Sequence, residues 1–302
     1  MIQPPVIQQN DKVIFVSPAG NIEADLLHKT VSIFRELGLR TQISPHALFE
    51  SGRFSGSVEQ RLSDLQSAMD DPDAKVIFCS RGGYGAVHLL NMLDFSEIKK
   101  NPKWLIGFSD ITALHLAFQK EGLVSLHAPM AKHFAEEGAD DFAVKQIKSI
   151  LQTGKTTYHI PVNDFQELNR SGKGTGELFG GNLAVFCGLL GTKFIEIPKG
   201  GILFIEDIGE EPYKTDRFIY QLKLAGIFDH ISALIVGRFS DYKEDEKMYA
   251  PLYESIYSAI KTHDFPVAFN FPVGHVKDNF PLLMGKSATI EINHKLIDFK
   301  QI

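Results

Sequence analysis

The chain of 302 residues has little of what marks several large classes of protein. It contains two cysteines, Cys79 and Cys187, both in apolar surroundings, which excludes a disulfide framework and fits small core residues in a reducing compartment. No stretch approaches the roughly 18 uninterrupted apolar residues of a membrane span, and the N-terminus shows no basic segment followed by an apolar one. We therefore expect a cytoplasmic protein that does not associate with membranes.

An excess of basic residues is also missing. Lysine and arginine number 31 against 37 aspartates and glutamates, which gives a net charge of −6, and no run of basic residues occurs. Because neutralising phosphates needs a basic surface, a general nucleic-acid binder is excluded. The chain has no G-x-x-x-x-G-K-[ST] and no H-E-x-x-H motif, and His127 and His133 stand six residues apart without further ligand spacing. We expect neither a metal nor another cofactor.

The first half alternates short β-branched runs with amphipathic helical patterns, which is typical of a parallel sheet covered on both faces. The expected strands are Val13–Ser17, Thr41–Ser44, Val76–Cys79, Trp104–Phe108 and Val124–His127. The expected helices are Glu23–Leu37, Val58–Met69, Ala86–Met92, Ile111–Gln119 and Asp141–Leu151. Ligands gather beyond the carboxyl ends of strands in such sheets, and three strand exits rich in small residues predict a crevice there.

The polar segment from Thr153 to Gly176 looks poor in strands and predicts a connection between two domains. We accordingly expect an N-terminal α/β domain at 1–153, a linker at 154–176 and a C-terminal domain at 177–302. The C-terminal part mixes predicted strands and helices. The strands are Gly201–Ile205, Ala233–Val236, Ala288–Ile292 and Leu296–Phe299, and the helices lie near Leu183–Leu190, Thr215–Leu224 and Tyr249–Lys261.

Ser109 lies where an apolar run ends at Gly107 and an amphipathic helical pattern begins. A hydroxyl at such a strand-to-helix turn projects above the sheet edge, beside the free N–H groups of the following helix. A serine nucleophile would be placed there, but serine is also a favoured helix N-cap. This segment alone leaves both interpretations open.

A serine nucleophile needs a base and a third group that orients this base. Glu206 and Asp207 follow an apolar strand, and His275 follows proline and glycine in the constrained loop Phe271-Pro-Val-Gly-His275. Taken singly, the glutamate could be a salt-bridged carboxylate and the histidine a hydrogen-bonded loop residue. Asp207 and Glu210 stay undecided between a structural and a substrate-facing role.

The turn Arg81-Gly-Gly-Tyr-Gly85 is rich in glycine. Without Cβ atoms, its N–H groups can approach a ligand oxygen closely, as an oxyanion hole or a phosphate cradle requires. A structural tight turn is the alternative.

Seven segments spread over nearly the whole chain closely resemble the LD-carboxypeptidase family of serine peptidases, which also contains the microcin C immunity peptidases. They are Val16-Ser-Pro-Ala-Gly20, Ser80-Arg-Gly-Gly-Tyr-Gly85, Gly107-Phe-Ser-Asp110, His127-Ala-Pro129, Phe179-Gly-Gly-Asn182, Phe204-Ile-Glu-Asp-Ile-Gly-Glu210 and Gly274-His275. By motif, the resemblance implies a triad of Ser109 as nucleophile, His275 as base and Glu206 as the carboxylate that holds the imidazole.

The resemblance also implies a flavodoxin-like, parallel-sheet N-terminal domain and a smaller mixed α/β, swivelling-type C-terminal domain. With this triad, the oxyanion would accept hydrogen bonds from the N–H groups of Asp110 and Gly83. Arg81 would bind the free carboxylate of the substrate, because a guanidinium offers two donors in a plane. A surface salt bridge is the alternative role of Arg81. The family further suggests a homodimer.

The activity that the resemblance implies is cofactor-free hydrolysis of the bond before a terminal D-amino acid, converting murein tetrapeptide to tripeptide in cell-wall recycling. One alternative is an immunity peptidase that cleaves a peptidyl or aminoacyl-adenylate-like toxin of the microcin C type. Another is a non-catalytic, flavodoxin-like protein that binds a ligand. Small peptides or peptidyl nucleotides are thus the expected partners.

Overall fold

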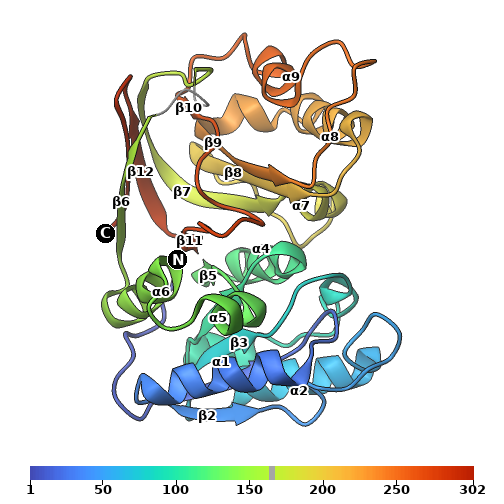
Figure 1. Cartoon of the computed structure of the whole chain (residues 1–302), viewed down its shortest axis with the longest axis vertical. Helices are drawn as coiled ribbons and strands as arrows, with labels where there is room; N and C mark the ends of the chain where they lie inside the picture. Colours follow the sequence, from blue (N-terminus) through green and yellow to red (C-terminus); the bar gives the residue numbers. More distant parts are fainter. Residues whose placement is uncertain (163–166) are drawn as a thin grey trace. The chain divides into compact units, whose positions relative to one another are not determined.

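The computed structural model describes residues 1–162 and 167–302, and two compact units divide the chain. Unit 1 contains Met1–Gly154 and also Phe280–Gly285, a short segment from late in the sequence. Unit 2 contains Lys155–Asn279 and Lys286–Ile302. Each unit is built on its own sheet, coloured blue to green for unit 1 except for the red β11, and mostly yellow to red for unit 2 (Figure 1).

Unit 1 contains a six-stranded sheet in the order β11-β5-β4-β3-β1-β2. Its strands are β1 (Lys12–Val16), β2 (Arg40–Ile43), β3 (Ala74–Cys79), β4 (Trp104–Gly107), β5 (Ser125–His127) and β11 (Leu282–Met284). The first five are parallel, and β11 pairs antiparallel with β5 at the edge. The order 2-1-3-4-5 is that of flavodoxin-like sheets, which confirms the expected fold of this unit.

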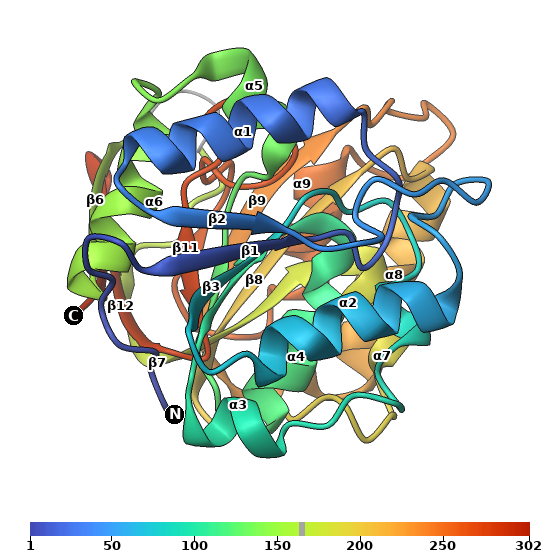
Figure 2. The ribbon, with the colours of Figure 1, turned by 90° about the horizontal axis from the view of Figure 1, so that it is seen from below.

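Helices cover both faces of this sheet, with α1 and α5 on one side and α2, α3 and α4 on the other (Figure 2). They are α1 (Ala24–Glu36), α2 (Val58–Asp70), α3 (Ser96–Lys100), α4 (Thr112–Lys120), α5 (Ala131–Glu137) and α6 (Phe142–Thr153). Phe15, Phe34, Phe78 and Phe134 are buried and meet ring to ring between the sheet and helices α1 and α5. Burial on both faces explains why the central strands β1, β3 and β4 are nearly continuous apolar runs, whereas the edge strand β2 is more polar.

Unit 2 contains a seven-stranded mixed sheet among its described residues, in the order β10-β9-β8-β7-β12-β13-β6. Its strands are β6 (Thr156–Pro161), β7 (Gly172–Asn182), β8 (Gly201–Ile208), β9 (Ile231–Ser240), β10 (Val267–Ala268), β12 (Ser287–Ile292) and β13 (Leu296–Gln301), and its helices are α7 (Leu183–Leu189), α8 (Pro212–Leu224) and α9 (Leu252–Ala259). Strands β7 to β10 run parallel, and the others pair antiparallel. This confirms the mixed α/β class expected for the C-terminal part.

Two local expectations are wrong. The segment expected as a helix at Ala86–Met92 forms only a 3₁₀ turn, η1 (Ala86–His88), followed by further turns. The stretch 153–176 is not poor in strands, since it contains β6 and the start of β7. Residues 163–166 of the predicted linker lie outside the described residues.

Candidate active site

Ser109 occupies a strained turn between β4 and α4. Its φ is 64°, and it begins the short 3₁₀ turn η2 (Ser109–Ile111) that leads into α4. A residue with a Cβ held in this left-handed region costs on the order of 1–3 kcal/mol, and such strain gathers at functional sites. Phe108 is the N-cap of η2 and Ile111 that of α4, so Ser109 is not a helix N-cap.

The glycine-rich turn lies directly against this serine. A Cβ added to Gly82 would stand 2.9 Å from the Ser109 Cβ, 3.2 Å from its Oγ and 3.3 Å from the Asp110 nitrogen. The Gly82 carbonyl accepts from the N–H of Gly20 at 2.8 Å, and Gly83 has a φ of 96°. Glycine at 82 permits the close approach to the serine, and glycine at 83 permits the positive φ.

The Asp110 carboxylate contacts the end of the same turn. It is buried, and its Oδ2 accepts a hydrogen bond from the Ala86 N–H at 2.8 Å. Burial raises the pKa of this carboxyl, against the opposing effects of the Ala86 hydrogen bond and the nearby His88 and Arg61. The side chain thus ties η2 to the end of the glycine-rich turn, while its backbone N–H lies next to Gly82.

Arg81 lies on the surface beside these residues. Its Nη1 donates to the Asn21 carbonyl at 2.7 Å, and no carboxylate of unit 1 forms an ion pair with it. One edge of the guanidinium is therefore held by backbone. The alternative of a surface salt bridge has no partner within this unit.

In unit 2, Glu206 and His275 form a hydrogen-bonded pair. Nδ1 of His275 lies 2.8 Å from Oε2 of Glu206, whose side chain is fully buried while the imidazole keeps 15% exposure. Glutamate accepts only, so the pair fixes the tautomer with Nδ1–H and makes Nε2 the basic nitrogen. A buried carboxylate bound to a partly exposed imidazole is the geometry of an oriented general base.

Irregular backbone makes room for this pair. The register between β8 and β9 shifts at Ile205 and Asp207, with Glu206 between them. A Cβ on Gly237 would stand 3.2 Å from the Glu206 Cβ, and one on Gly274 would stand 3.0 Å from its Oε2. Such bulges commonly redirect a side chain next to an active site.

The histidine loop is held by two polar residues that the sequence analysis did not single out. Ser240 Oγ donates to the His275 carbonyl at 2.8 Å, and Asn279 Oδ1 accepts from the Gly274 N–H at 3.0 Å. Asn279 is buried. Single polar residues on a strand end and in a loop carry no recognisable sequence signal for this contact.

Asp207 and Glu210, undecided from the sequence, have different surroundings. Asp207 is buried and accepts from Asn182 Nδ2 at 2.8 Å and from the Ala184 N–H at 2.9 Å. Burial, helped by the charge of Glu206, raises its pKa to about 6. Glu210 forms an ion pair with Lys214 at 3.7 Å. The Asp207 contacts join β8 to α7, and the Glu210 ion pair joins the segment after β8 to α8.

The described residues show neither a metal-binding cluster nor a membrane-spanning helix. Residues 1–162 and 167–302 contain no group of three or more histidine, cysteine, aspartate or glutamate side chains that could hold a metal ion. In the same ranges, no helix combines the length and the apolar character that crossing a membrane requires.

Known proteins match the chain along nearly its full length. Family models described as the LD-carboxypeptidase N-terminal and C-terminal domains match residues 13–128 and 175–290. A probable murein peptide carboxypeptidase of Bacillus subtilis is 32% identical over 97% of this chain and 92% of its own. The microcin C7 self-immunity protein MccF of Escherichia coli is 29% identical over 82% of this chain and 80% of its own.

The fold agrees with these matches. The crystal structure of the muramoyltetrapeptide carboxypeptidase from Oxalobacter formigenes superposes with a TM-score of 0.87 at 28% identity, over 96% of this chain and 98% of that one. Two domain models in the expected order, a relative above 30% identity and a shared fold lead to one conclusion. The chain belongs to the LD-carboxypeptidase family of peptidases.

Proposed function

We propose that the protein is a serine-type LD-carboxypeptidase that removes the terminal D-amino acid from murein tetrapeptide. The observation that carries the proposal is the left-handed Ser109 at the exit of β4, packed against Gly82 of the glycine-rich turn. The hydrogen-bonded Glu206 and His275 supply the base and its orienting carboxylate. The Bacillus subtilis relative named as a probable murein peptide carboxypeptidase and the structure named as a muramoyltetrapeptide carboxypeptidase support this substrate.

The reaction then proceeds by acyl transfer. Nε2 of His275 accepts the Ser109 proton as Oγ attacks the carbonyl carbon, and it returns this proton to the amine of the leaving D-amino acid. The buried Glu206 carboxylate stabilises the imidazolium that forms between these steps. Water, activated by the same histidine, hydrolyses the acyl-enzyme and releases the tripeptide. The mechanism requires Ser109 of unit 1 to meet His275 of unit 2 in the substrate complex.

Two backbone donors would stabilise the oxyanion. The N–H of Asp110 follows the nucleophile directly, and that of Gly83 lies in the turn that packs against it. Such donors act in the transition state, where negative charge develops on the substrate oxygen, and removing one typically costs about 10²–10³ in turnover.

Arg81 would bind the free carboxylate at the end of the peptide. Its guanidinium is exposed and has further N–H donors beyond the one that binds Asn21. A carboxypeptidase must distinguish a terminal carboxylate from an amide, and a charge-assisted pair provides that difference.

The test is product analysis by mass spectrometry with three substrates: murein tetrapeptide, its all-L analogue and a peptidyl aminoacyl-adenylate mimic. We expect release of D-alanine from the first only, and loss of this activity in Ser109→Ala. Ser32→Ala, which removes an exposed hydroxyl of α1 bonded to its own helix, is the control and retains full activity. Turnover by purified, folded Ser109→Ala would refute the serine mechanism.

The relative named for immunity to microcin C7 supports a second candidate, cleavage of a peptidyl-nucleotide toxin. Cleavage of the adenylate mimic with no action on the tetrapeptide would establish it in place of the first. Binding without cleavage of any of the three would point to a ligand-binding protein instead. We further propose a cytoplasmic homodimer, which light scattering of the purified protein and fractionation of cells would test.

A further inference from the structure

A buried arginine, Arg61, lies in the first turn of α2 and reaches the loops that follow β1 and β3. Only 2% of the residue is exposed. Its Nη1 donates to the Pro18 carbonyl at 2.8 Å and to the Gly85 carbonyl at 2.9 Å. Pro18 follows β1 and Gly85 follows β3, so one guanidinium nitrogen connects the exits of two neighbouring strands. Arginine is rarely buried without a specific partner, and here the partners are backbone carbonyls.

The surroundings hold the guanidinium in one orientation. Its carbon lies 5.0 Å from the centre of the Phe54 ring, in cation–π contact, and Nη2 lies 3.5 Å from Nδ1 of His88. The Asp110 carboxylate interacts electrostatically with it. A Cβ on Gly85, which has a φ of 125°, would stand 2.8 Å from Nη1, so glycine at this position is what allows the arginine to reach the carbonyl.

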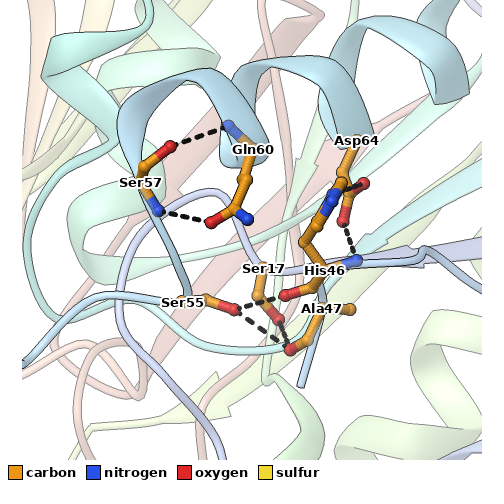
Figure 3. A network of polar contacts seen from close by, with 7 residues as sticks. All are labelled: Ser17, His46, Ala47, Ser55, Ser57, Gln60 and Asp64. Atoms are coloured by element: carbon orange, nitrogen blue, oxygen red, sulfur yellow. Dashed lines mark hydrogen bonds and ion pairs between the residues drawn. The ribbon is translucent and has the colours of Figure 1, made fainter. Parts of the chain in front are cut away.

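The helix that carries Arg61 is itself fixed at its N-terminal end (Figure 3). Ser57 and Gln60 form a capping box, with Ser57 N–H donating to Gln60 Oε1 at 2.9 Å. The Asp64 carboxylate accepts from the backbone N–H of His46 at 2.9 Å and lies 2.8 Å from its Nδ1. The Asp64 contacts, unlike the capping box, join α2 to the loop after β2, and they restrict the base of the Arg61 side chain.

The glycine-rich turn is therefore held from two sides. Arg61 binds the Gly85 carbonyl, and the Asp110 carboxylate binds the N–H of the next residue, Ala86. At its other end, the Gly82 carbonyl accepts from the Gly20 N–H, two residues beyond the Pro18 that Arg61 also binds. Gly83 lies between these fixed points.

We propose that Arg61 is a positioning residue that sets the distance between the two oxyanion donors, the N–H groups of Gly83 and Asp110. The proposal rests on the assignment of Ser109 as nucleophile. In this role Arg61 acts by holding the turn that carries Gly83 against the residue that follows the serine. Lysine cannot replace it fully, because an ammonium lacks the planar group that lies over Phe54 and the second nitrogen that lies near His88.

The first experiment compares Arg61→Met and Arg61→Lys with Gln60→Ala, which weakens the same helix through its capping box but leaves the arginine in place. Oxyanion donors act only in the transition state, so we expect kcat on murein tetrapeptide to fall by about 10²-fold in Arg61→Met with KM nearly unchanged. The kcat of Arg61→Lys should lie between those of the wild type and Arg61→Met. Gln60→Ala should keep the wild-type kcat although it unfolds at a lower temperature.

Hydrogen exchange of the peptide that spans residues 82–86 gives a measure that needs no activity. We expect faster exchange in Arg61→Met than in the wild type, and no change in Gln60→Ala. A second measure is chemical rescue: methylguanidinium, at concentrations that leave the unfolding temperature unchanged, should restore part of the kcat of Arg61→Ala.

The outcomes separate this proposal from the one on which it rests. Turnover by Ser109→Ala would overturn the serine mechanism, whatever the arginine variants do. An inactive Ser109→Ala together with wild-type kcat in folded Arg61→Met would overturn the role of Arg61 alone. Equal losses of kcat in Arg61→Met and Gln60→Ala, without rescue, would show that Arg61 only stabilises the fold.

Discussion

Replacing Glu206 by glutamine would separate the catalytic use of this carboxylate from its cost to the folded state. The side chain is fully buried, its Oε2 lies 2.8 Å from Nδ1 of His275, and its Oε1 has no hydrogen-bond partner among the described residues. Glutamine has nearly the same shape, so the packing around Gly237 and Gly274 is kept. What changes is the charge beside the imidazole and the control of its tautomer.

The expected loss of activity is large. An amide in place of the carboxylate can donate to Nδ1, which holds the imidazole in the wrong tautomer, and it no longer stabilises the imidazolium. In triads of this kind the change lowers kcat by about 10⁴-fold, which corresponds to about 5 kcal/mol in the activation free energy.

The expected change in stability is small. A neutral amide costs less to bury than a carboxylate, but its NH₂ group needs acceptors of its own, so the two effects oppose each other. We expect the free energy of unfolding to stay within about 1 kcal/mol of the wild type. The melting temperature should then move by only about 3 °C.

The assay is steady-state hydrolysis of murein tetrapeptide together with thermal unfolding of the same preparations. Glu291→Gln is a matched control, since this exposed glutamate on β12 of the same unit forms only a 4.0 Å ion pair with Lys173. It should retain both activity and stability. If Glu206→Gln kept more than a tenth of the wild-type kcat, Glu206 could not be the carboxylate that orients the base.

Three more substitutions test the site. In Gly82→Ala the new Cβ would stand 2.9 Å from the Ser109 Cβ, so we expect kcat to fall by at least about 10²-fold. The control Gly188→Ala, with open space around its Cβ, should stay active. Equal activity of the two variants would contradict the packing argument. Arg81→Met should raise KM for the free peptide about 10²-fold and abolish the preference over a C-terminally amidated peptide; an unchanged preference would remove Arg81 from the binding site. Burial raises the pKa of Asp207 from 3.8 to about 6, so its ionisation favours the unfolded chain, and the stability it contributes at low pH is lost as the pH rises from about 4 to 6. Over this pH range, urea unfolding should show that the free energy of unfolding of Asp207→Asn declines by up to about 3 kcal/mol less than that of the wild type. Parallel curves for the two proteins would mean that the pKa of Asp207 is not raised.

The parallel strands of unit 1 were predictable because both of their faces are buried. Trp104–Gly107 and Ala74–Cys79 read as unbroken apolar runs, and each expected strand lies within two residues of its observed ends. Apolar side chains leave water on either face of such a strand, so the hydrophobic effect itself marks the position.

The strands at the start of unit 2 were missed for a different reason. β7 carries glycines where the sequence suggests a loop, but a Cβ on Gly176 would stand 2.0 Å from the Gly200 carbonyl oxygen, and one on Gly174 would stand 2.6 Å from that of Ser232. These glycines admit another stretch of backbone that is remote in the sequence. Local sequence patterns cannot distinguish a glycine that admits close backbone packing from a glycine in a turn.

The residues of the candidate site were likewise predictable only in part. Motif resemblance indicated Ser109, Glu206 and His275, because their chemistry requires particular residue types. It gave no sign of Arg61, which the sequence shows only as one more polar residue in an amphipathic helix. Its contact with Pro18 and Gly85 spans 43 and 24 residues. Only the packing of α2 against the strand exits reveals what it holds.

The sequence by itself thus determined the class of the fold and the family, and it named the candidate site residues, because these follow from local hydrophobic patterns and from residue identity. The tertiary structure decided the left-handed backbone of Ser109, the glycine turn packed against it, the burial of Glu206 at a shift in register and the reach of Arg61. Each of these depends on which distant segments come within a few ångströms of one another. That is a property of the packed chain, and no stretch of sequence contains it alone.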